Sequence, residues 1–435
     1  MSESEGMESG RDWATLDPAS RRAELARESG AILRMGRLML SAGTASYRVK
    51  EAMSRAAEAL GVDRHHAHVT LTEITATSHR GPIFRTEVTE VRQVTINADR
   101  IARLDRLKED LAPGWTVDRL NAALDAIEAK QSPYPAWANA AFGGAACAAF
   151  AVLNNARPWE VLAVFVAATL GQAVRRWLVH RGFNHFGTTM IAAVVASTAF
   201  LTGVAIINAL PVGSATQSAG FVSAVLFLVP GFAIVTGALD LAKLDFSAGV
   251  SRTAFATMIL LGASLGIWAV SIVGGLEPQV GAPFAIGPAA LWGRRLAASG
   301  IGVRGFALMF NSSIGMALAA AGIGALANVG RLWMVEHGLV VQAATLVACV
   351  VVGVLAAALS SKTRWPIITL SVPATLIMIP GVKVYGTMVK FNDGFSVDAL
   401  AQGTDAIFVV LSIAVGLVIA KLITDPEWSF EKVGR

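Results

Sequence analysis

Two Pro-Gly pairs are the residues whose type and spacing best suit binding chemistry. Pro230-Gly231 and Pro380-Gly381 lie 150 residues apart, each inside a long apolar run. Proline removes a backbone donor and clashes with the preceding helical turn, and glycine adds backbone freedom. The freed backbone groups cannot face lipid, so they must face protein or a water-filled cavity. A helix N-terminus suits a carboxylate and free carbonyls suit an ammonium, so the pairs indicate a site for an amino-acid zwitterion. A packing kink is the plainer alternative.

Ionisable residues follow both pairs at short range. Asp240 and Asp245 come after the first pair, and Lys383 and Tyr385 come after the second. Because charge within a bilayer is costly, we interpret Asp240 or Asp245 as a proton-coupling carboxylate. An interfacial charge at a helix end is the alternative for each. We place Asp240, Lys383 and Tyr385 on the expected translocation path.

Asn155 and Asn311 are polar residues near the ends of apolar runs. We assign both to the same path, although capping of a helix end explains them as well.

Other kinds of site lack support in the sequence. Both cysteines lie in apolar runs, which indicates neither a disulfide framework nor a metal cluster. The group His65, His66, His68 and Glu73 lacks the ligand spacing of known metal sites. No nucleophile–base set, nucleotide loop or phosphate-binding motif is present. We therefore expect no enzyme activity, no metal, no cofactor and no nucleic-acid partner.

Membrane-spanning helices must carry the Pro-Gly pairs. The chain is 54% hydrophobic and 15% charged, against roughly 25% charged in a typical soluble domain. Of its 36 Lys and Arg, 19 precede residue 136, as do 20 of its 31 Asp and Glu. The rest of the chain has too few charges to cover a soluble surface, and about 20 apolar residues suffice for one helical crossing. We predict ten spans at 136–153, 159–177, 186–208, 217–239, 254–274, 297–311, 314–333, 338–360, 366–389 and 405–424.

The membrane half contains an internal repeat. The segment RRWLVHRGF at 175–183 matches RLWMVEHGL at 331–339, and Asn155 falls on Asn311 at the same offset of 156. The segment LVPGF at 228–232 matches MIPGV at 378–382, at an offset of 150. Each copy would hold five spans, and since five is odd, the second copy would be inverted. Inverted repeats are typical of secondary transporters, whose sites lie at broken helices. A duplicated scaffold without transport is the alternative.

The residues before the first span predict a small α+β domain. Helical periodicity over 28–60 breaks at Gly43-Thr44, strand-like runs follow at 67–78, 83–89 and 91–96, and helical runs follow at 98–109 and 117–130. Lys and Arg in the loops after spans 2, 4 and 8 favour a cytoplasmic N-terminal domain and C-terminus.

The fold class is thus a polytopic α-helical membrane protein with about ten transmembrane helices in two inverted five-helix repeats. We divide the chain into a disordered polar tail at 1–27, a cytoplasmic α+β domain at 28–135, a first repeat at 136–280, a second repeat at 281–424 and a cytoplasmic tail at 425–435.

The segment GRLMLSAGTASYRVKE at 36–51, the segment VTIN at 94–97 and the two Pro-Gly pairs resemble the threonine/serine exporter (ThrE) family. The resemblance runs from about residue 30 to 424 and matches the single-chain form, with a cytoplasmic domain before two five-helix modules. It implies proton-driven export of threonine and serine. It places the family's Pro-Gly motifs on the two pairs and its acidic position after the first motif on Asp240.

We therefore expect a secondary exporter of small neutral hydroxy amino acids in the inner cell membrane, working by proton antiport and alternating access. Its expected partners are the amino-acid substrate, protons and the lipid bilayer, and the sequence leaves homo-oligomerisation open. Two alternatives remain. One is a membrane-anchored receptor whose soluble domain senses a small metabolite, and the other is an integral-membrane enzyme with that domain as its catalytic part.

Overall fold

The chain divides into two compact units. The computed structural model describes residues 13, 16–91, 95–210, 220–274, 284, 286–392 and 394–426. The first unit comprises Met1–Ser132 with Leu239–Arg252, and the second comprises Pro133–Ala238 with Thr253–Arg435. The N-terminal domain was expected to end at residue 135. The grouping of Leu239–Arg252 with the N-terminal residues was not expected from the sequence.

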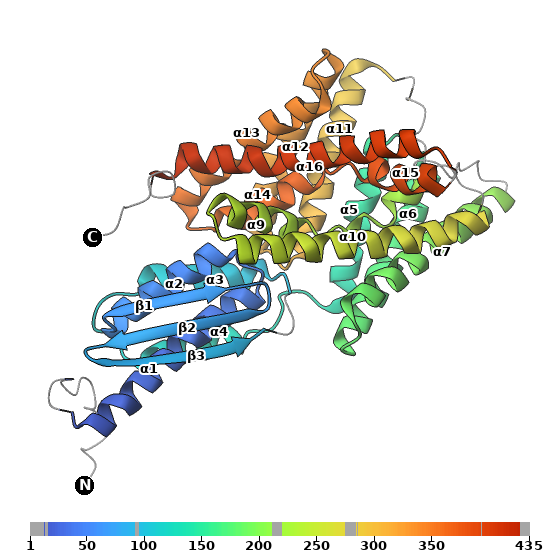
Figure 1. The fold of residues 1–435 in the computed structure, drawn as a ribbon. Coiled ribbons are helices and arrows are strands. Elements are labelled where there is room, and N and C mark those ends of the chain that lie inside the picture. The colour runs from blue at the N-terminus through green and yellow to red at the C-terminus, as the bar shows by residue number, and fades with distance from the viewer. Residues whose placement is uncertain are drawn as a thin grey trace, which may run out of the picture. The chain divides into compact units, whose positions relative to one another are not determined.

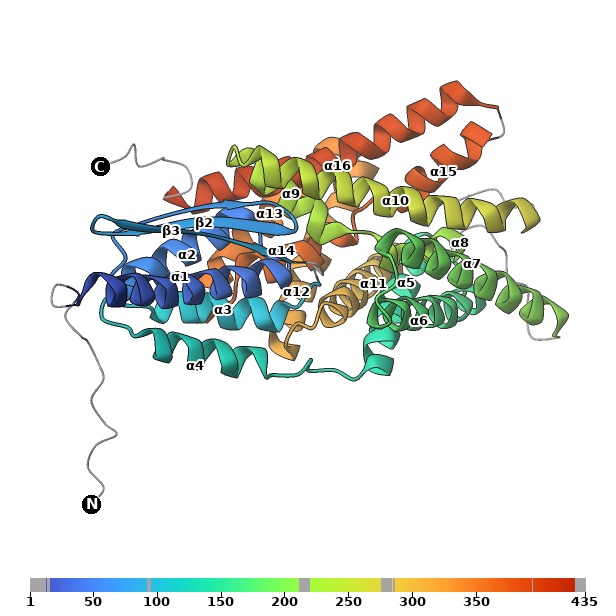
Figure 2. The ribbon, with the colours of Figure 1, turned by 60° about the horizontal axis from the view of Figure 1, so that its bottom comes forward.

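The first unit has an α+β fold (Figure 1). An antiparallel sheet in the order β1-β2-β3 is covered on one face by helices (Figure 2). Ile74 and Ala76 of its middle strand belong to the same buried core as residues of α1 and α2. The elements are α1 (Pro18–Ser41), α2 (Ser46–Leu60), β1 (Arg64–Val69), β2 (Glu73–Arg80), β3 (Ile83–Glu90), α3 (Ala98–Asp110) and α4 (Val117–Glu128).

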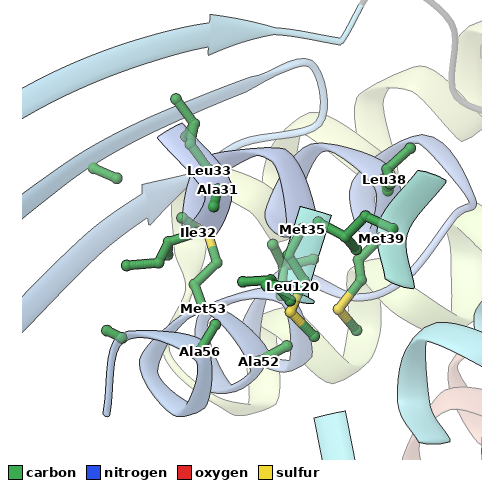
Figure 3. Close-up of a cluster of buried hydrophobic side chains, with 14 of the residues drawn as sticks. Ala31, Ile32, Leu33, Met35, Leu38, Met39, Ala52, Met53, Ala56 and Leu120 are labelled. Carbon is green, nitrogen blue, oxygen red and sulfur yellow. The ribbon is translucent and has the colours of Figure 1, made fainter. Parts of the chain in front are cut away.

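Capping residues and a methionine-rich core hold these helices in place. The Asp17 carboxylate accepts the first-turn amides of α1, and Gly61, with a φ of 78°, ends α2. Ile32 and Met35 of α1 pack against Met53 of α2 in the core shown in Figure 3. Burial raises the pKa of Glu28 on α1 to about 7, against the opposing charge of Arg80.

The structure differs from the expected elements of this unit in three places. Helix α1 begins at Pro18, inside the stretch 1–27 that we expected to be a disordered tail. The expected strand at 67–78 is a hairpin, because the Thr70 hydroxyl and backbone close a tight turn with Glu73. The expected strand at 91–96 includes residues 92–94, which lie outside the described residues, and its other members join no strand.

The second unit is built almost entirely of helices. Seven of those described are long and apolar enough to cross a membrane, and two bent pairs raise the number to nine. The expected span at 297–311 is part of α11, which begins nine residues earlier and carries three arginines. The elements are α5 (Ala136–Leu153), α6 (Pro158–His180), α7 (His185–Ala209), α8 (Gly220–Ser223), η2 (Leu226–Leu228), α9 (Gly231–Ala242), α10 (Phe246–Gly274), α11 (Pro288–Met309), α12 (Ile314–Glu336), α13 (Val341–Thr363), α14 (Ile367–Leu376), α15 (Gly381–Asn392) and α16 (Ser396–Thr424).

The two halves of the membrane region repeat the same elements. Helices α6 and α12 begin and end 156 residues apart, and α9 and α10 match α15 and α16 at an offset of 150. Backbone details repeat as well, because Asn155 and Asn311 both have a φ of 61°. A Cβ atom added to Gly266 would lie 2.6 Å from the Met190 carbonyl oxygen, and one added to Gly416 would lie 2.7 Å from the Leu346 carbonyl oxygen. The same helices therefore approach closely at equivalent glycines in both copies.

Candidate functional site

Both Pro-Gly pairs break a helix. The segment from α8 through η2 bends by 59° into α9 at Pro230-Gly231, and α14 bends by 57° into α15 at Pro380-Gly381. The amide of each glycine donates to the carbonyl two residues before it, at 2.9 Å in both copies. The carbonyl of each proline accepts the amide four residues on, at 3.1 Å in both. Helices α9 and α15 therefore begin at the break, and the amides of the two residues after each glycine have no carbonyl of their own helix to bond.

The two breaks contact each other reciprocally. A Cβ atom added to Gly231 would lie 1.9 Å from Leu376 Cδ2, and one added to Gly381 would lie 3.3 Å from Leu226 Cδ1. Leu226 and Leu376 are separated by the same 150 residues as the glycines. Such an exchange of equivalent contacts is what a two-fold relation between two copies produces.

Polar side chains are buried beside the breaks among apolar ones. Residues 221–228 and 368–379 are all buried. The Thr236 hydroxyl donates to the Phe232 carbonyl at 2.7 Å, and the Thr375 hydroxyl donates to the Val372 carbonyl at 3.0 Å. Tyr385 is 1% exposed, and its ring lies edge-on to Phe221 with centroids 5.7 Å apart. Tyr385 is thus part of this buried crossing.

Asp240 lies in the first unit, where it caps α2. Its side chain is 0% exposed, and its Oδ1 accepts from the Ser46 amide at 2.9 Å and from the Ser46 hydroxyl at 3.1 Å. The residue at the usual capping position, Ala45, has no side-chain acceptor. The other carboxylate oxygen lies 3.1 Å from Nε of Arg252, which is 1% exposed. A carboxylate from the far end of α9 therefore supplies the cap that α2 lacks.

Further contacts attach the turn between α9 and α10 to the start of α2. Asp245 shares the single hydrogen of the Ser46 hydroxyl with Asp240 and lies 2.7 Å from Lys50 Nζ. Arg252 Nη2 donates to the Thr44 carbonyl at 2.8 Å. Ser46 and Lys50 belong to the segment 36–51 that carried the family resemblance, but nothing in the sequence paired them with residues some 200 positions later.

Charged residues fix α2 within the first unit. Arg48 donates to Asp105 of α3, and Lys108 Nζ donates to Glu51 at 3.0 Å. Burial would raise the pKa of Asp105, but Arg48 and Lys108 together hold it below its ordinary value. Asp105 is therefore charged at neutral pH, and the start of α2 is anchored on both sides.

Lys383 has an acidic partner on another helix. Its Nζ lies 2.8 Å from Asp405 Oδ2 on α16, and the Gln342 amide donates to the other Asp405 oxygen at 3.3 Å. Neither charged side chain is fully buried by the rest of the protein.

Asn155 and Asn311 end helices α5 and α11. Each adopts the left-handed backbone conformation, and the residue after each donates its amide to the carbonyl five residues earlier. This is a common helix ending in which asparagine sometimes takes the place of glycine. Asn155 Oδ1 also accepts from Arg294 at 2.9 Å. The geometry favours the capping interpretation for both.

Two family models match the chain, one after the other. A ThrE family model, described as a threonine/serine exporter, matches residues 31–273, and a second, "Threonine/Serine exporter, ThrE", matches residues 295–423.

No three His, Cys, Asp or Glu side chains gather as metal ligands among the described residues. Cys147 and Cys349 are both free and buried.

Three relatives are similar to the chain. "Probable succinate transporter subunit YjjP" of Klebsiella aerogenes is 26% identical over 55% of this chain and 91% of its own length. The protein of the same name from Escherichia coli K12 is 26% identical over 57% of this chain and 95% of its own length. "Probable threonine/serine exporter" of Mycobacterium tuberculosis H37Rv is 26% identical over 91% of this chain and 76% of its own length. No solved structure matches the chain.

Proposed function

Because the chain belongs to the threonine/serine exporter family, a family of transporters rather than enzymes, we propose that it exports threonine and serine. The observation that carries the proposal is the pair of broken helices that contact each other through equivalent residues, Gly231 with Leu376 and Gly381 with Leu226. Broken helices at the interface of two repeats are where secondary transporters bind solutes. The first turns of α9 and α15 offer amides to a carboxylate there.

We further propose that the two repeats are inverted and that transport proceeds by alternating access. Each copy holds five spans when each bent pair counts as one crossing and α11 as another. The reciprocal glycine contacts support a two-fold relation between the copies. With an odd number of spans, that axis lies in the membrane plane. We also propose that the membrane is the cytoplasmic one and that the N-terminal domain and the C-terminus face the cytoplasm, because the loops after spans 2, 4 and 8 carry Lys and Arg.

We propose that Asp240 or Asp245 is the proton-coupling carboxylate. Protonation of Asp240 would weaken both its ion pair with Arg252 and its cap on α2. The other charged groups that face it are Asp245 and, through Asp245, Lys50. Proton binding would therefore loosen the attachment between the end of α9 and the start of α2.

Succinate is the second candidate substrate, because two relatives are named as succinate transporter subunits. Threonine, serine and succinate all carry a carboxylate, which is the chemistry that a helix N-terminus favours. The word "subunit" in those names also supports an assembly of more than one chain.

Flux into sealed proteoliposomes tests the proposed function. We expect purified protein to take up labelled threonine and serine when protons flow out of the liposomes down an imposed gradient. We expect a protonophore to abolish this transport. Liposomes without protein are the control. Flux of succinate alone would move the proposal to the second candidate, and the absence of any carboxylate flux would contradict it.

A further inference from the structure

A second repeated motif contains an arginine in a membrane helix. The sequence Gln172-Ala-Val-Arg175-Arg-Trp177 on α6 corresponds to Asn328-Val-Gly-Arg331-Leu-Trp333 on α12, 156 residues later. Each copy keeps a side-chain amide three residues before an arginine and a tryptophan two residues after it. Residues three apart lie on one face of a helix, so the amide and the guanidinium are neighbours in both copies.

In the first copy the arginine is held by a chain of buried amides. Arg175 Nη1 donates to Gln172 Oε1 at 3.4 Å. The Gln172 amide nitrogen donates to Asn139 of α5 at 3.1 Å, and Asn139 donates to the Met309 carbonyl at 2.7 Å. Gln172 and Asn139 are both buried. Because the nitrogen of Gln172 is engaged with α5, its carbonyl oxygen is turned to the guanidinium.

The second copy repeats this arrangement. Arg331 Nε donates to Asn328 Oδ1 at 3.0 Å, and the Asn328 amide nitrogen donates to the Ser299 hydroxyl of α11 at 2.9 Å. Asn328 and Ser299 are fully buried. In both copies the amide takes one of the five N–H groups of the guanidinium. An amide oxygen is neutral, so it orients the cation without neutralising it.

Neither arginine forms an ion pair within the part of the chain that the structure describes. Charge within a membrane protein is costly and is normally paired. Each acidic residue described in the second unit has a partner elsewhere. The pairs are Glu160 with the Arg157 amide, Glu336 with Arg295, Asp398 with Lys390, Asp405 with Lys383, and Asp425 with Lys421. Arg175 and Arg331 are therefore both held in place without an anionic partner among the described residues.

Each arginine lies on a helix that passes the break of its own copy. A Cβ atom at Gly171, next to Gln172, would lie 2.7 Å from Phe227, three residues before Pro230. A Cβ atom at Gly324 of α12 would lie 2.9 Å from the Cα atom of Ala374, six residues before Pro380. Helices α6 and α12, which carry the arginines, thus both pass beside the crossing.

An interfacial anchor at a helix end is the plainer explanation, since cations are favoured near helix C-termini and in cytoplasmic loops. It accounts for Arg176 and Arg181, which add to the charge at the end of α6. It does not account for the second copy, where leucine and histidine replace Arg176 and Arg181 while the amide–arginine pair is kept. The amide–arginine pair is therefore repeated in both copies, whereas the additional positive charge of Arg176 and Arg181 is not.

We propose that Arg175 and Arg331 are carboxylate-binding residues, one in each repeat, and that each holds the carboxylate of the transported solute. Guanidinium groups bind carboxylates through two parallel hydrogen bonds. This inference rests on the proposed function and deepens it, because it names the chemical group of the solute that is recognised. A zwitterionic amino acid has one carboxylate and would bind one arginine at a time. A dicarboxylate has two and could bind both arginines together.

Isosteric acidic variants provide the test. Gln172→Glu and Asn328→Asp place a carboxylate beside each arginine at almost unchanged volume, so the new carboxylate competes with the solute. Binding of labelled threonine and labelled succinate to the purified full-length protein is measured by equilibrium dialysis. We expect the affinity for whichever carboxylate binds to fall at least about tenfold in each variant. Arg175→Gln and Arg331→Gln should show the same loss, and Arg176→Gln is the matched control.

A purely structural role for the arginines gives a different pattern, because a new internal ion pair would leave solute affinity unchanged. Threoninamide, which lacks the carboxylate, supplies the chemical control, and the preference for threonine over it should disappear in the acidic variants. Unchanged affinity in both acidic variants, a loss as large in Arg176→Gln, or no binding of either carboxylate to the unaltered protein would overturn the inference. If the variants lose solute binding as expected but the unaltered protein shows no flux in proteoliposomes, the proposed function is overturned and the inference about the arginines stands.

Discussion

Replacing Arg252 with methionine is expected to destabilise the protein by about 3–5 kcal/mol, because it leaves the carboxylate of Asp240 buried without its cation. Asp240 is 0% exposed and Arg252 is 1% exposed, so water cannot take the place of the lost partner. The variant also loses the hydrogen bond from Arg252 to the Thr44 carbonyl. Chemical unfolding of the detergent-purified full-length protein measures the effect.

Two further variants give this prediction its controls. Lys50→Met removes the cation that pairs with Asp245, but Lys50 is 33% exposed, so its loss should cost no more than about 1 kcal/mol. Combining Asp240→Asn with Arg252→Met removes both buried charges and should recover part of the lost stability. If Arg252→Met were as mild as Lys50→Met, or if the double variant were less stable than the single one, the ion pair would not hold this turn in place.

Gly231→Ala is expected to destabilise the crossing by about 1–3 kcal/mol and to abolish most transport. The new methyl group would lie 1.9 Å from Leu376 Cδ2, so the buried leucine would have to move. Gly381→Ala should be much milder, since its methyl group would lie 3.3 Å from Leu226 Cδ1. Transport in proteoliposomes at matched protein amounts measures both variants.

Rescue distinguishes a specific contact from general damage. Adding Leu376→Ala to Gly231→Ala makes room for the methyl group and should restore a substantial part of the transport. Leu226→Ala is the matched control, because it removes the equivalent leucine of the other copy and leaves the clash in place. Rescue by Leu226→Ala but not by Leu376→Ala would mean that the breaks do not meet as described.

The sequence predicted the broken helices because their cause is local. A proline followed by a glycine removes a backbone donor and adds backbone freedom at one point of a helix, so breaks could be predicted at Pro230 and Pro380 without knowledge of any neighbour. Most span positions followed equally from apolar run length. The span at 297–311 was the exception, because the arginines of α11 obscure its start.

The contacts of Asp240 could not be predicted from the sequence. Its partner Ser46 stands 194 residues away, and a serine before an apolar helix gives no sign that a distant carboxylate caps it. The hairpin of β1 and β2 was missed for a related reason. The alternation of strand residues continues through Thr70 and Thr72, and no glycine or proline marks the turn.

The arginine motif shows what a repeat adds to sequence reasoning. The match at 175 and 331 was visible as identical letters, but the amides at 172 and 328 differ in residue type. Only the structure shows that Gln172 and Asn328 play the same part, each donating to a neighbouring helix and accepting from its arginine.

Sidedness labelling tests most directly the claim that the two repeats face opposite ways across the membrane. Arg181 and His337 are exposed, equivalent residues just after α6 and α12, and each can be replaced by cysteine in a chain carrying Cys147→Ala and Cys349→Ala. A membrane-impermeant maleimide applied to intact cells should label position 337 and should reach position 181 only after permeabilisation. Labelling of both positions from the same side would contradict the inverted arrangement.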